Sequence, residues 1–218
     1  PDQTVNEGDS FSSISLDDYV TDAATDDAAI SWVATGQSNL TVRITNRVAT
    51  IGASANWYGA EVITFTATDN DGINPMSDSD AATFTANQVN DAPVFSSSAI
   101  TSATQDVQYS YTVTASDVDV SDALTFAATT LPSWLSFDGT ATISGTPLNE
   151  HVGTYTVILT VSDYFGPVEL PLIITVTNTN DAPIFTSIQT TAAIEDSAYS
   201  YTVTASDVDV SDALTFAA

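Results

Sequence analysis

A period of 90 residues constrains this chain more than any other feature of its sequence. The string YSYTVTASDVDVSDALTFAA occupies residues 109–128 and returns unchanged at residues 199–218. The strings NDAPVF and NDAPIF begin at Asn90 and Asn180, which gives the same spacing of 90 residues. Repeats of this length are whole domains, because the repeats of solenoids are shorter and cannot fold alone. The sequence therefore predicts domains in tandem.

The period divides the chain into three parts. Residues 1–90 are a divergent unit, recognisable because VTDAATDDAAISW at 20–32 can be laid on ASDVDVSDALTF at 115–126 with one inserted residue. Residues 91–180 are a complete unit, and residues 181–218 are the first part of a third. We expect the first unit to begin slightly inside a domain. We expect the third to have been cut from a longer array, with completion by a neighbouring chain as the alternative.

Alternation of apolar and polar residues indicates strands throughout the repeats. It is clear at Tyr109, Tyr111 and Val113, and turn strings such as FDGT at 137–140 separate one run from the next. No stretch has a convincing helical period. Several strands in about ninety residues match a seven-stranded antiparallel sandwich. The predicted fold class is all-β, with tandem Ig/cadherin-like β-sandwiches in an elongated array and Trp134 in one core.

The charge of the chain favours cations as partners. There are 28 acidic residues against two basic ones, and the formal net charge is −26. Such a surface repels nucleic-acid phosphates and anionic lipid, so we expect neither nucleic acid nor direct membrane insertion. Only five of the acids are Glu, and Asp is the short carboxylate that serves turns and oxygen-ligand cages. A merely solvated acidic surface, as in a halophilic protein, remains the alternative.

The residues for common catalytic sites are missing. The chain has no cysteine and no G-x-S-x-G motif, so its one histidine, His151, has no recognisable nucleophile for which it could act as the base. Asp is abundant enough to supply the pair of carboxylates that glycoside hydrolysis needs. Carboxylates that bind a metal ion, however, make poor general acids. We therefore predict that the protein is not an enzyme.

Several motifs together resemble a known family. They are LPSWLSFDGTATISGTP at 131–147, GTYTVILTVSD at 153–163 and VTNTNDAPIF at 176–185. They resemble bacterial cadherin-like tandem repeats, the dystroglycan-type cadherin-like and "Putative Ig" modules of large surface adhesins. The resemblance covers essentially all of 91–218, while residues 1–90 are similar to a related unit more loosely.

The resemblance implies calcium at the junctions between successive domains. A hard dication takes six to eight oxygen ligands, and carboxylates gathered without it would repel one another. For the junction between the first and second units, the matching positions are Glu7, Asp69, Asp71, Asn87, Asn90, Asp91, Asp117 and Asp119. For the second junction they are Gln105, Asp163, Asn178, Asn180, Asp181, Asp207 and Asp209.

Two departures from the family pattern weaken the second junction. Gln105 stands where Glu7 and Glu195 stand in the other units, so one charge is lost unless Asp106 replaces it. The linker NTNDAP is also one residue shorter than the linker of animal cadherins and begins with Asn. We expect fewer or more weakly bound ions there.

The function that the resemblance implies is mechanical. It predicts a calcium-rigidified extension or spacer segment of a bacterial extracellular adhesin or surface fibre, whose partners are calcium, the neighbouring repeats and other copies in a fibre. One alternative is a carbohydrate-binding module that holds polysaccharide on exposed aromatic side chains. Its candidate side chains are Trp57, Tyr58, Tyr164 and Phe165. Another alternative is a filament subunit whose incomplete third repeat is completed by a neighbour.

Overall fold

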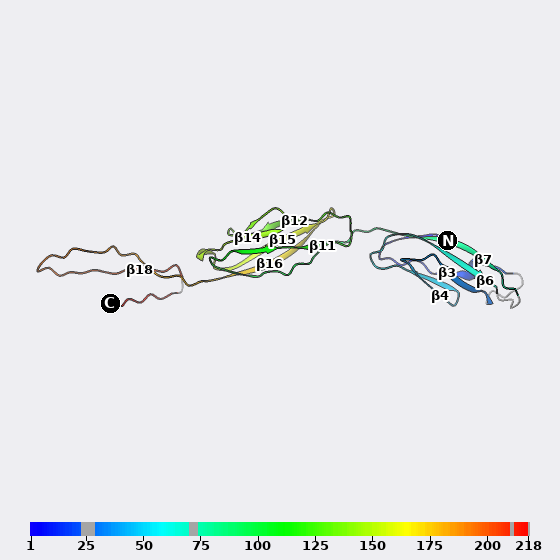
Figure 1. Ribbon diagram of the computed structural model, residues 1–218, viewed down its shortest axis with the longest axis horizontal. Coiled ribbons are helices and arrows are strands. Elements are labelled where there is room, and N and C mark those ends of the chain that lie inside the picture. Colours follow the sequence, from blue (N-terminus) through cyan, green and yellow to red (C-terminus); the bar gives the residue numbers. More distant parts are fainter. Residues whose placement is uncertain (23–28, 70–73, 210–211, 218) are drawn as a thin grey trace. The chain divides into compact units, whose positions relative to one another are not determined.

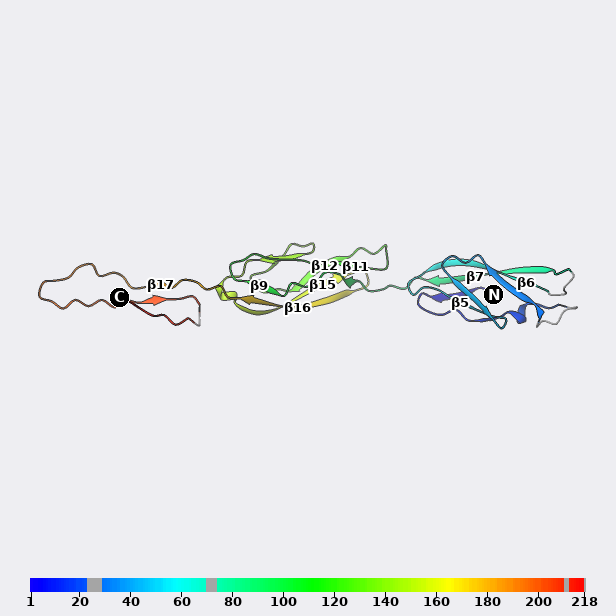
Figure 2. The ribbon, with the colours of Figure 1, turned by 60° about the horizontal axis from the view of Figure 1, so that its bottom comes forward.

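The computed structural model describes residues 1–22, 29–69, 74–209 and 212–217 (Figure 1). The chain divides into two compact units, with the division between Asn90 and Asp91. Both units are built from strands packed as sheets (Figure 2), and the described residues contain no α-helix. The predicted all-β class is therefore confirmed. None of the helical segments described is long and apolar enough to cross a membrane.

The first unit packs a four-stranded sheet against a three-stranded one. The larger sheet has the order β1 (Gln3–Asn6), β7 (Ser77–Asn87), β6 (Gly59–Thr68) and β3 (Ser31–Thr35). The smaller has the order β2 (Ile14–Ser15), β5 (Val48–Gly52) and β4 (Thr41–Thr45), and the short 3₁₀ segment η1 (Leu16–Tyr19) follows β2. Phe84 is fully buried, and the edge of its ring meets Phe11 with 5.4 Å between ring centroids. Burial alternates along β6 and β7, as the period of two predicts.

One carboxylate is buried in the first unit, where it fixes a loop. Glu61 on β6 is 9% exposed, and its two oxygens accept hydrogen bonds from the backbone N–H groups of Ser38, Asn39 and Leu40. The side chains of Ser38 and Asn39 donate two more. Burial raises the pKa of Glu61, but these hydrogen bonds outweigh it and lower the pKa from 4.5 to about 2.

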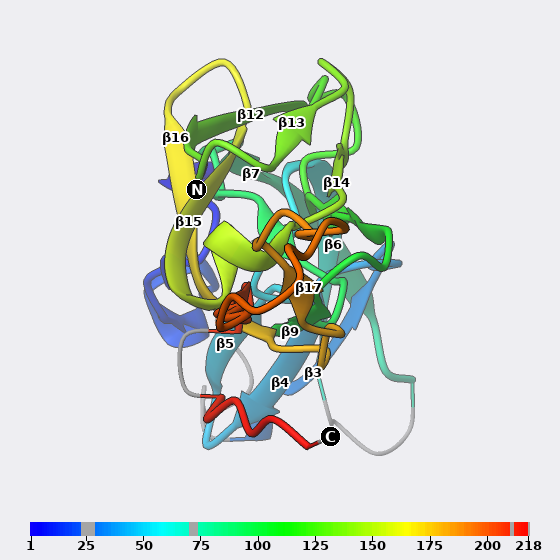
Figure 3. The same cartoon turned by 90° about the vertical axis from the view of Figure 1, so that its left-hand side faces the viewer.

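The second unit is also made of packed sheets. Its four-stranded sheet has the order β12 (Thr125–Thr130), β15 (Gly153–Ser162), β16 (Pro167–Thr177) and β9 (Ser102–Thr104), and the first three lie side by side in Figure 3. A three-stranded sheet has the order β10 (Tyr109–Thr112), β14 (Thr142–Gly145) and β13 (Ser136–Phe137). The pair β8 (Val94–Phe95) and β11 (Ala115–Ser116) adds a short ladder, and the 3₁₀ segment η3 (Asn149–His151) precedes β15.

Trp134 lies in the core of the second unit, as the sequence predicts. It is 7% exposed, and its ring meets the rings of Tyr109 and Tyr155 edge to face at 5.8 and 6.1 Å. Such aromatic pairs add about 0.5 to 1.5 kcal/mol each beyond the burial of their area. Ile143 and Val157 are fully buried in the same cluster.

Strand direction gives each sandwich two distinct ends. In the second unit, β15 runs from Gly153, opposite Val176, to Ser162, opposite Thr125. Asp163 follows at one end, which we call the Asp163 end, while Gln105 donates its backbone N–H to Thr177 O at the other, the Gln105 end. Ten residues of strand separate the two ends, a distance of about 30 Å.

Residues 181–218 are grouped by their contacts with the second unit. Their strands β17 (Ile184–Phe185) and β18 (Ala205–Ser206) pair with each other. The division of 91–218 into a complete repeat and part of a third stays a prediction.

Candidate metal centres

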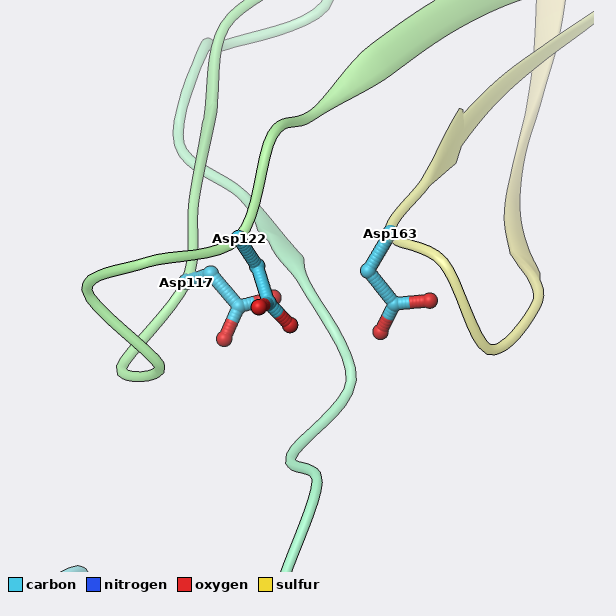
Figure 4. A group of neighbouring side chains, drawn as sticks. All are labelled: Asp117, Asp122 and Asp163. Atoms are coloured by element: carbon cyan, nitrogen blue, oxygen red, sulfur yellow. The ribbon is translucent and has the colours of Figure 1, made fainter.

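Three aspartates meet at the Asp163 end of the second unit. Asp117 follows β11, Asp122 precedes β12, and Asp163 follows β15. One carboxylate oxygen from each lies within 4.8 Å of the other two. Figure 4 shows Asp117 and Asp122 on one loop and Asp163 on the turn across from it. Residues from two separate loops thus form one acidic cluster, which we call the first cluster.

A fourth aspartate holds the loop of the first cluster in shape. Asp119 is 3% exposed, and its carboxylate accepts the backbone N–H of Asp91 at 2.8 Å. Its own N–H donates to Asp117 Oδ1 at 2.9 Å, and its carbonyl accepts the N–H of Asp122 at 3.0 Å. These bonds set the loop so that the carboxylates of Asp117 and Asp122 stay together.

One oxygen of the first cluster is buried without a donor. Asp117 Oδ2 is closed off from solvent, and within the described part of the chain it accepts no hydrogen bond. A buried anionic oxygen left unsatisfied is costly, because it has lost water and gained nothing in return. A bound cation would satisfy it, so the residues present fit a metal ion.

The negative charges of the first cluster affect the pKa of Asp122. Partial burial raises the pKa of Asp122, and the negative charges of Asp119, Asp117 and Asp163 raise it further. Asp163 Oδ1 accepts the N–H groups of Phe165 and Gly166 at 2.7 and 2.8 Å, which fixes the turn that carries it. Carboxylate oxygens are hard ligands of the kind that calcium takes.

The same loop returns 90 residues later and forms a second cluster. Asp207, Asp209 and Asp212 bring carboxylate oxygens within 4.8 Å of one another. Asp209 N–H donates to Asp207 Oδ1 at 2.9 Å, and Asp209 Oδ2 accepts the N–H of Asp181 at 2.7 Å. These are the counterparts of the bonds around Asp119, so the loop shape is a property of the repeated sequence.

The second cluster also receives side chains from the Gln105 end. Gln105 is 1% exposed and donates from Nε2 to Asp181 Oδ2 at 2.8 Å, while Asn149 donates to Asp209 Oδ1 at 3.2 Å. Gln105 Oε1 accepts the N–H of Thr179. The predicted residues Gln105, Asp181, Asp207 and Asp209 are therefore brought together.

Two linker asparagines lie close to these residues along the chain. Asn178 and Asn180 are exposed at the Gln105 end, and Asn180 donates to the carbonyl of Asp181.

The predicted grouping of Asp163 with Gln105 is wrong. Asp163 lies at the far end of β15, about 30 Å from the Gln105 end, and belongs to the first cluster instead. The reason is that β15 runs back along the domain after β14, a reversal that spacing in the sequence does not reveal.

The predicted grouping of Asp69 with Glu7 is wrong for the same reason. Asp69 follows β6 and pairs with Met76 through two hydrogen bonds of 3.0 Å. Glu7 N–H donates to Asn87 O, beside the start of β6 at Gly59. The ten residues of β6 lie between them. Asp71 lies outside the described residues.

The other residues predicted for the first junction divide between the two units. Glu7, Asn87 and Asn90 belong to the first unit, and Asp91, Asp117 and Asp119 belong to the second. Glu7 Oε2 is buried and accepts no hydrogen bond from the described residues, as expected of a ligand oxygen. Whether these two sets share an ion stays a prediction.

Sequence reasoning missed Asp122, Asp212 and Asn149. The first two lie within the identical twenty-residue strings and share the period of 90, which could have identified them. Asn149 is in η3, and no local pattern marks it, because its partner Asp209 is 60 residues away.

Comparisons with known proteins agree with this architecture. Residues 92–179 match the family described as "Putative Ig domain". The search of curated proteins found no match. The family match bears out the predicted resemblance to Ig-like modules over residues 92–179.

Solved structures similar to the chain include two cadherins. Drosophila N-cadherin EC1-4 is 15% identical, with 85% of this chain and 50% of that chain covered and a TM-score of 0.46. Human protocadherin-24 EC1-2 is 16% identical, with 82% and 93% covered and a TM-score of 0.43. An endo-fucoidan hydrolase of glycoside hydrolase family 107 is 24% identical, with 69% of this chain covered and a TM-score of 0.36. The chain spans about a quarter of that hydrolase, 24% of its length. At these scores the likeness carries nothing about function.

Proposed function

We propose that this chain, a tandem of cadherin-like and Ig-like modules whose residues 92–179 match the "Putative Ig domain" family, is a calcium-rigidified spacer of a bacterial extracellular adhesin or surface fibre. Ig-like domains are typical of extracellular proteins, and such a segment needs length and stiffness more than a ligand pocket. Its partners are calcium and the neighbouring repeats, with other copies in a fibre.

The observation that carries the proposal is the repeated acidic loop. Two loops 90 residues apart have the same hydrogen bonds around Asp119 and around Asp209. Each loop contributes to a group of three carboxylates that lie within 4.8 Å of one another. In the first, Asp117 Oδ2 is buried without a donor among the described residues. A plain acidic surface does not explain this, because solvated carboxylates would spread apart to reduce their repulsion.

Calcium is the ion that suits these donors. It takes six to eight oxygens in flexible geometry, and the side chains at both clusters supply carboxylate or amide oxygens. Asp117, Asp122 and Asp163 would hold an ion at the first cluster. Asp207, Asp209 and Asp212 would do so at the second. When bound, the ion would neutralise the gathered charge and fix the loops that supply its ligands.

The second cluster should bind more weakly than the first. Gln105 donates an amide proton to Asp181, which partly satisfies a carboxylate that an ion would otherwise hold. We expect dissociation constants in the range of about 10⁻⁴ to 10⁻³ M, as in extracellular calcium modules.

The test is calcium titration of the whole chain by calorimetry, with small-angle scattering in calcium and in chelator. We expect binding that the double variant Asp117→Asn, Asp207→Asn weakens at both clusters. The matched control is Asp18→Asn, which removes one exposed acid outside the clusters. Absence of binding, or the same affinity in the double variant, would contradict the sites. Binding with an unchanged scattering profile would contradict the spacer.

Polysaccharide binding has less support. Of the four candidate aromatics, Trp57 is partly buried and packs against the first core. Tyr164 and Phe165 are exposed and meet edge to face at 5.7 Å, a geometry that presents no shared flat face for a sugar ring.

We propose no catalytic role for His151. Its Nδ1 accepts the N–H of Leu148 at 2.9 Å, and Glu150 lies 3.8 Å from its Nε2. The imidazole thus closes the turn of η3.

A further inference from the structure

One turn occurs three times in the chain with a different side chain at its key position. Glu7 and Gln105 each follow a strand that pairs in parallel with the last long strand of its unit. Each donates its backbone N–H to that strand, Glu7 to Asn87 O at 2.9 Å and Gln105 to Thr177 O at 3.0 Å. Glu195 occupies the corresponding position 90 residues after Gln105. Because the backbone setting is shared, the side chain decides what the turn can hold.

The two side chains differ in whether their polar atoms are satisfied. Glu7 Oε2 is buried and accepts no hydrogen bond within the described ranges. Gln105 is 1% exposed, yet its whole amide is used. Its Nε2 donates to Asp181 Oδ2 at 2.8 Å and to Asp106 Oδ2 at 3.2 Å, and its Oε1 accepts the N–H of Thr179 at 3.2 Å. The amide therefore needs no further ligand.

The orientation of the Gln105 amide follows from these partners. If the amide were turned over, its carbonyl oxygen would face two carboxylate oxygens, and its NH₂ group would face the N–H of Thr179. A glutamate at this position would bring three carboxylates together, which would repel one another without a cation. The NH₂ group of Gln105 thus satisfies two acids that would otherwise call for an ion.

A second amide acts in the same way 44 residues further along the chain. Asn149 in η3 donates from Nδ2 to Asp209 Oδ1 at 3.2 Å, across 60 residues of sequence. Asp209 Oδ2 in turn accepts the N–H of Asp181 at 2.7 Å. The hydroxyl of Thr179 adds a bond to the carbonyl of Gln105 at 3.3 Å. Two amides of residues 91–180 thus hold two linked aspartates of residues 181–218.

We infer that Gln105 and Asn149 form an amide clamp that fixes linker residues 178–181 without a metal ion, and that Gln105 is the residue that makes this joint independent of calcium. Hydrogen bonds to a charged acceptor are stronger than those between neutral groups. An ion at the second cluster would add to the joint but would not be needed to form it. The inference rests on the proposed spacer function and adds that one of its joints stays stiff in chelator.

The test is ¹⁵N relaxation of the backbone of residues 178–181 in the whole chain, in calcium and in chelator. For the wild type we expect order parameters of about 0.8 in both conditions, the range of rigid backbone. The variant Gln105→Glu should fall below about 0.6 in chelator and recover in calcium. The matched control Gln108→Glu adds the same charge at an exposed position three residues away and should behave as the wild type.

The variant Asn149→Asp tests the second half of the clamp and leaves the buried Gln105 in place. It should loosen residues 178–181 in chelator and recover in calcium, as Gln105→Glu does. The amides of Val157 and Leu159 on β15 serve as a reference for the folded second unit, because both side chains are fully buried. This variant decides the question even if Gln105→Glu disturbs the fold.

A mobile wild-type linker in chelator, beside a rigid β15, would overturn the inference. So would either clamp variant that stays as rigid as the wild type in chelator, or an equal loss of order in Gln108→Glu. The wild-type measurement in chelator involves no ion. A failure of the clamp is therefore distinguished from a failure of calcium binding, which the calorimetric titration detects separately.

Discussion

Replacing Glu61 by Gln is expected to destabilise the first unit by about 2 to 3 kcal/mol at neutral pH. The two oxygens of Glu61 accept five hydrogen bonds from residues 38–40. An amide offers one oxygen, and its NH₂ group would face donors instead of accepting from them. The lowering of the Glu61 pKa from 4.5 to about 2 corresponds to about 3 kcal/mol of stabilisation, at 1.36 kcal/mol for each pKa unit.

The pH dependence follows from the sign of this shift. Because the folded pKa lies below the unfolded value, the contribution of Glu61 is fully present above pH 4.5 and is lost as the pH falls toward 2. The wild-type protein and the Glu61→Gln variant should therefore differ most at neutral pH and converge in acid.

The assay is urea unfolding monitored by hydrogen exchange of peptides from the first unit, at pH values from 7 to 2.5. The matched control is Glu169→Gln, because Glu169 is an exposed acid on a strand of the second unit. Equal stability of Glu61→Gln and wild type at pH 7 would refute the reasoning. So would a difference that persists undiminished at pH 2.5.

Three further predictions concern the second unit. Gly145→Ala should destabilise it by about 3 kcal/mol or more, because a Cβ there would lie 1.8 Å from the carbonyl oxygen of Trp134; thermal unfolding measures this. Burial, with a smaller effect of Tyr111, raises the pKa of Tyr109 to about 12. The neutral phenol of Tyr109 therefore stabilises the folded second unit fully below pH 10, and this stabilisation is lost as the pH rises toward 12. Tyr109→Phe should remove that alkaline dependence, as unfolding between pH 9 and 12 would show. Asp163→Asn should weaken calcium binding at the first cluster and spare the second, whereas the reverse in calorimetry would restore the grouping predicted from sequence.

Much of the fold follows from the sequence because its signals are local. Alternation along residues such as Val157, Leu159 and Val161 predicts a strand with one face inward, and all three are buried. Trp134 is the large aromatic of its repeat, and it lies in the core. The turn from Asp117 to Asp122 is also local, since the hydrogen bonds within it join residues two or three apart. A local feature repeats wherever its sequence repeats.

The placement of acids along the domain could not be predicted in this way. Asp163 and Asp69 each follow a ten-residue strand, and only the direction of that strand decides which end of the sandwich they occupy. The two ends look alike in sequence, because both carry Asp and Asn beside turns. Antiparallel pairing is a long-range property of the fold. Because of it, Asp163 lies with Asp117 and Asp122, and the predicted grouping with Gln105 does not form.

The sequence by itself determined the period of 90 residues, the strands, the acidic loops and the Ig-like character of the repeats, because each depends on residues close together in the chain. Tertiary structure alone decided which acids meet. The identical strings at 109–128 and 199–218 form the same hydrogen bonds between Asp117 and Asp119 and between Asp207 and Asp209. Asp163 reaches Asp117 and Asp122 only because β15 runs antiparallel to β12 and ends beside its first residue.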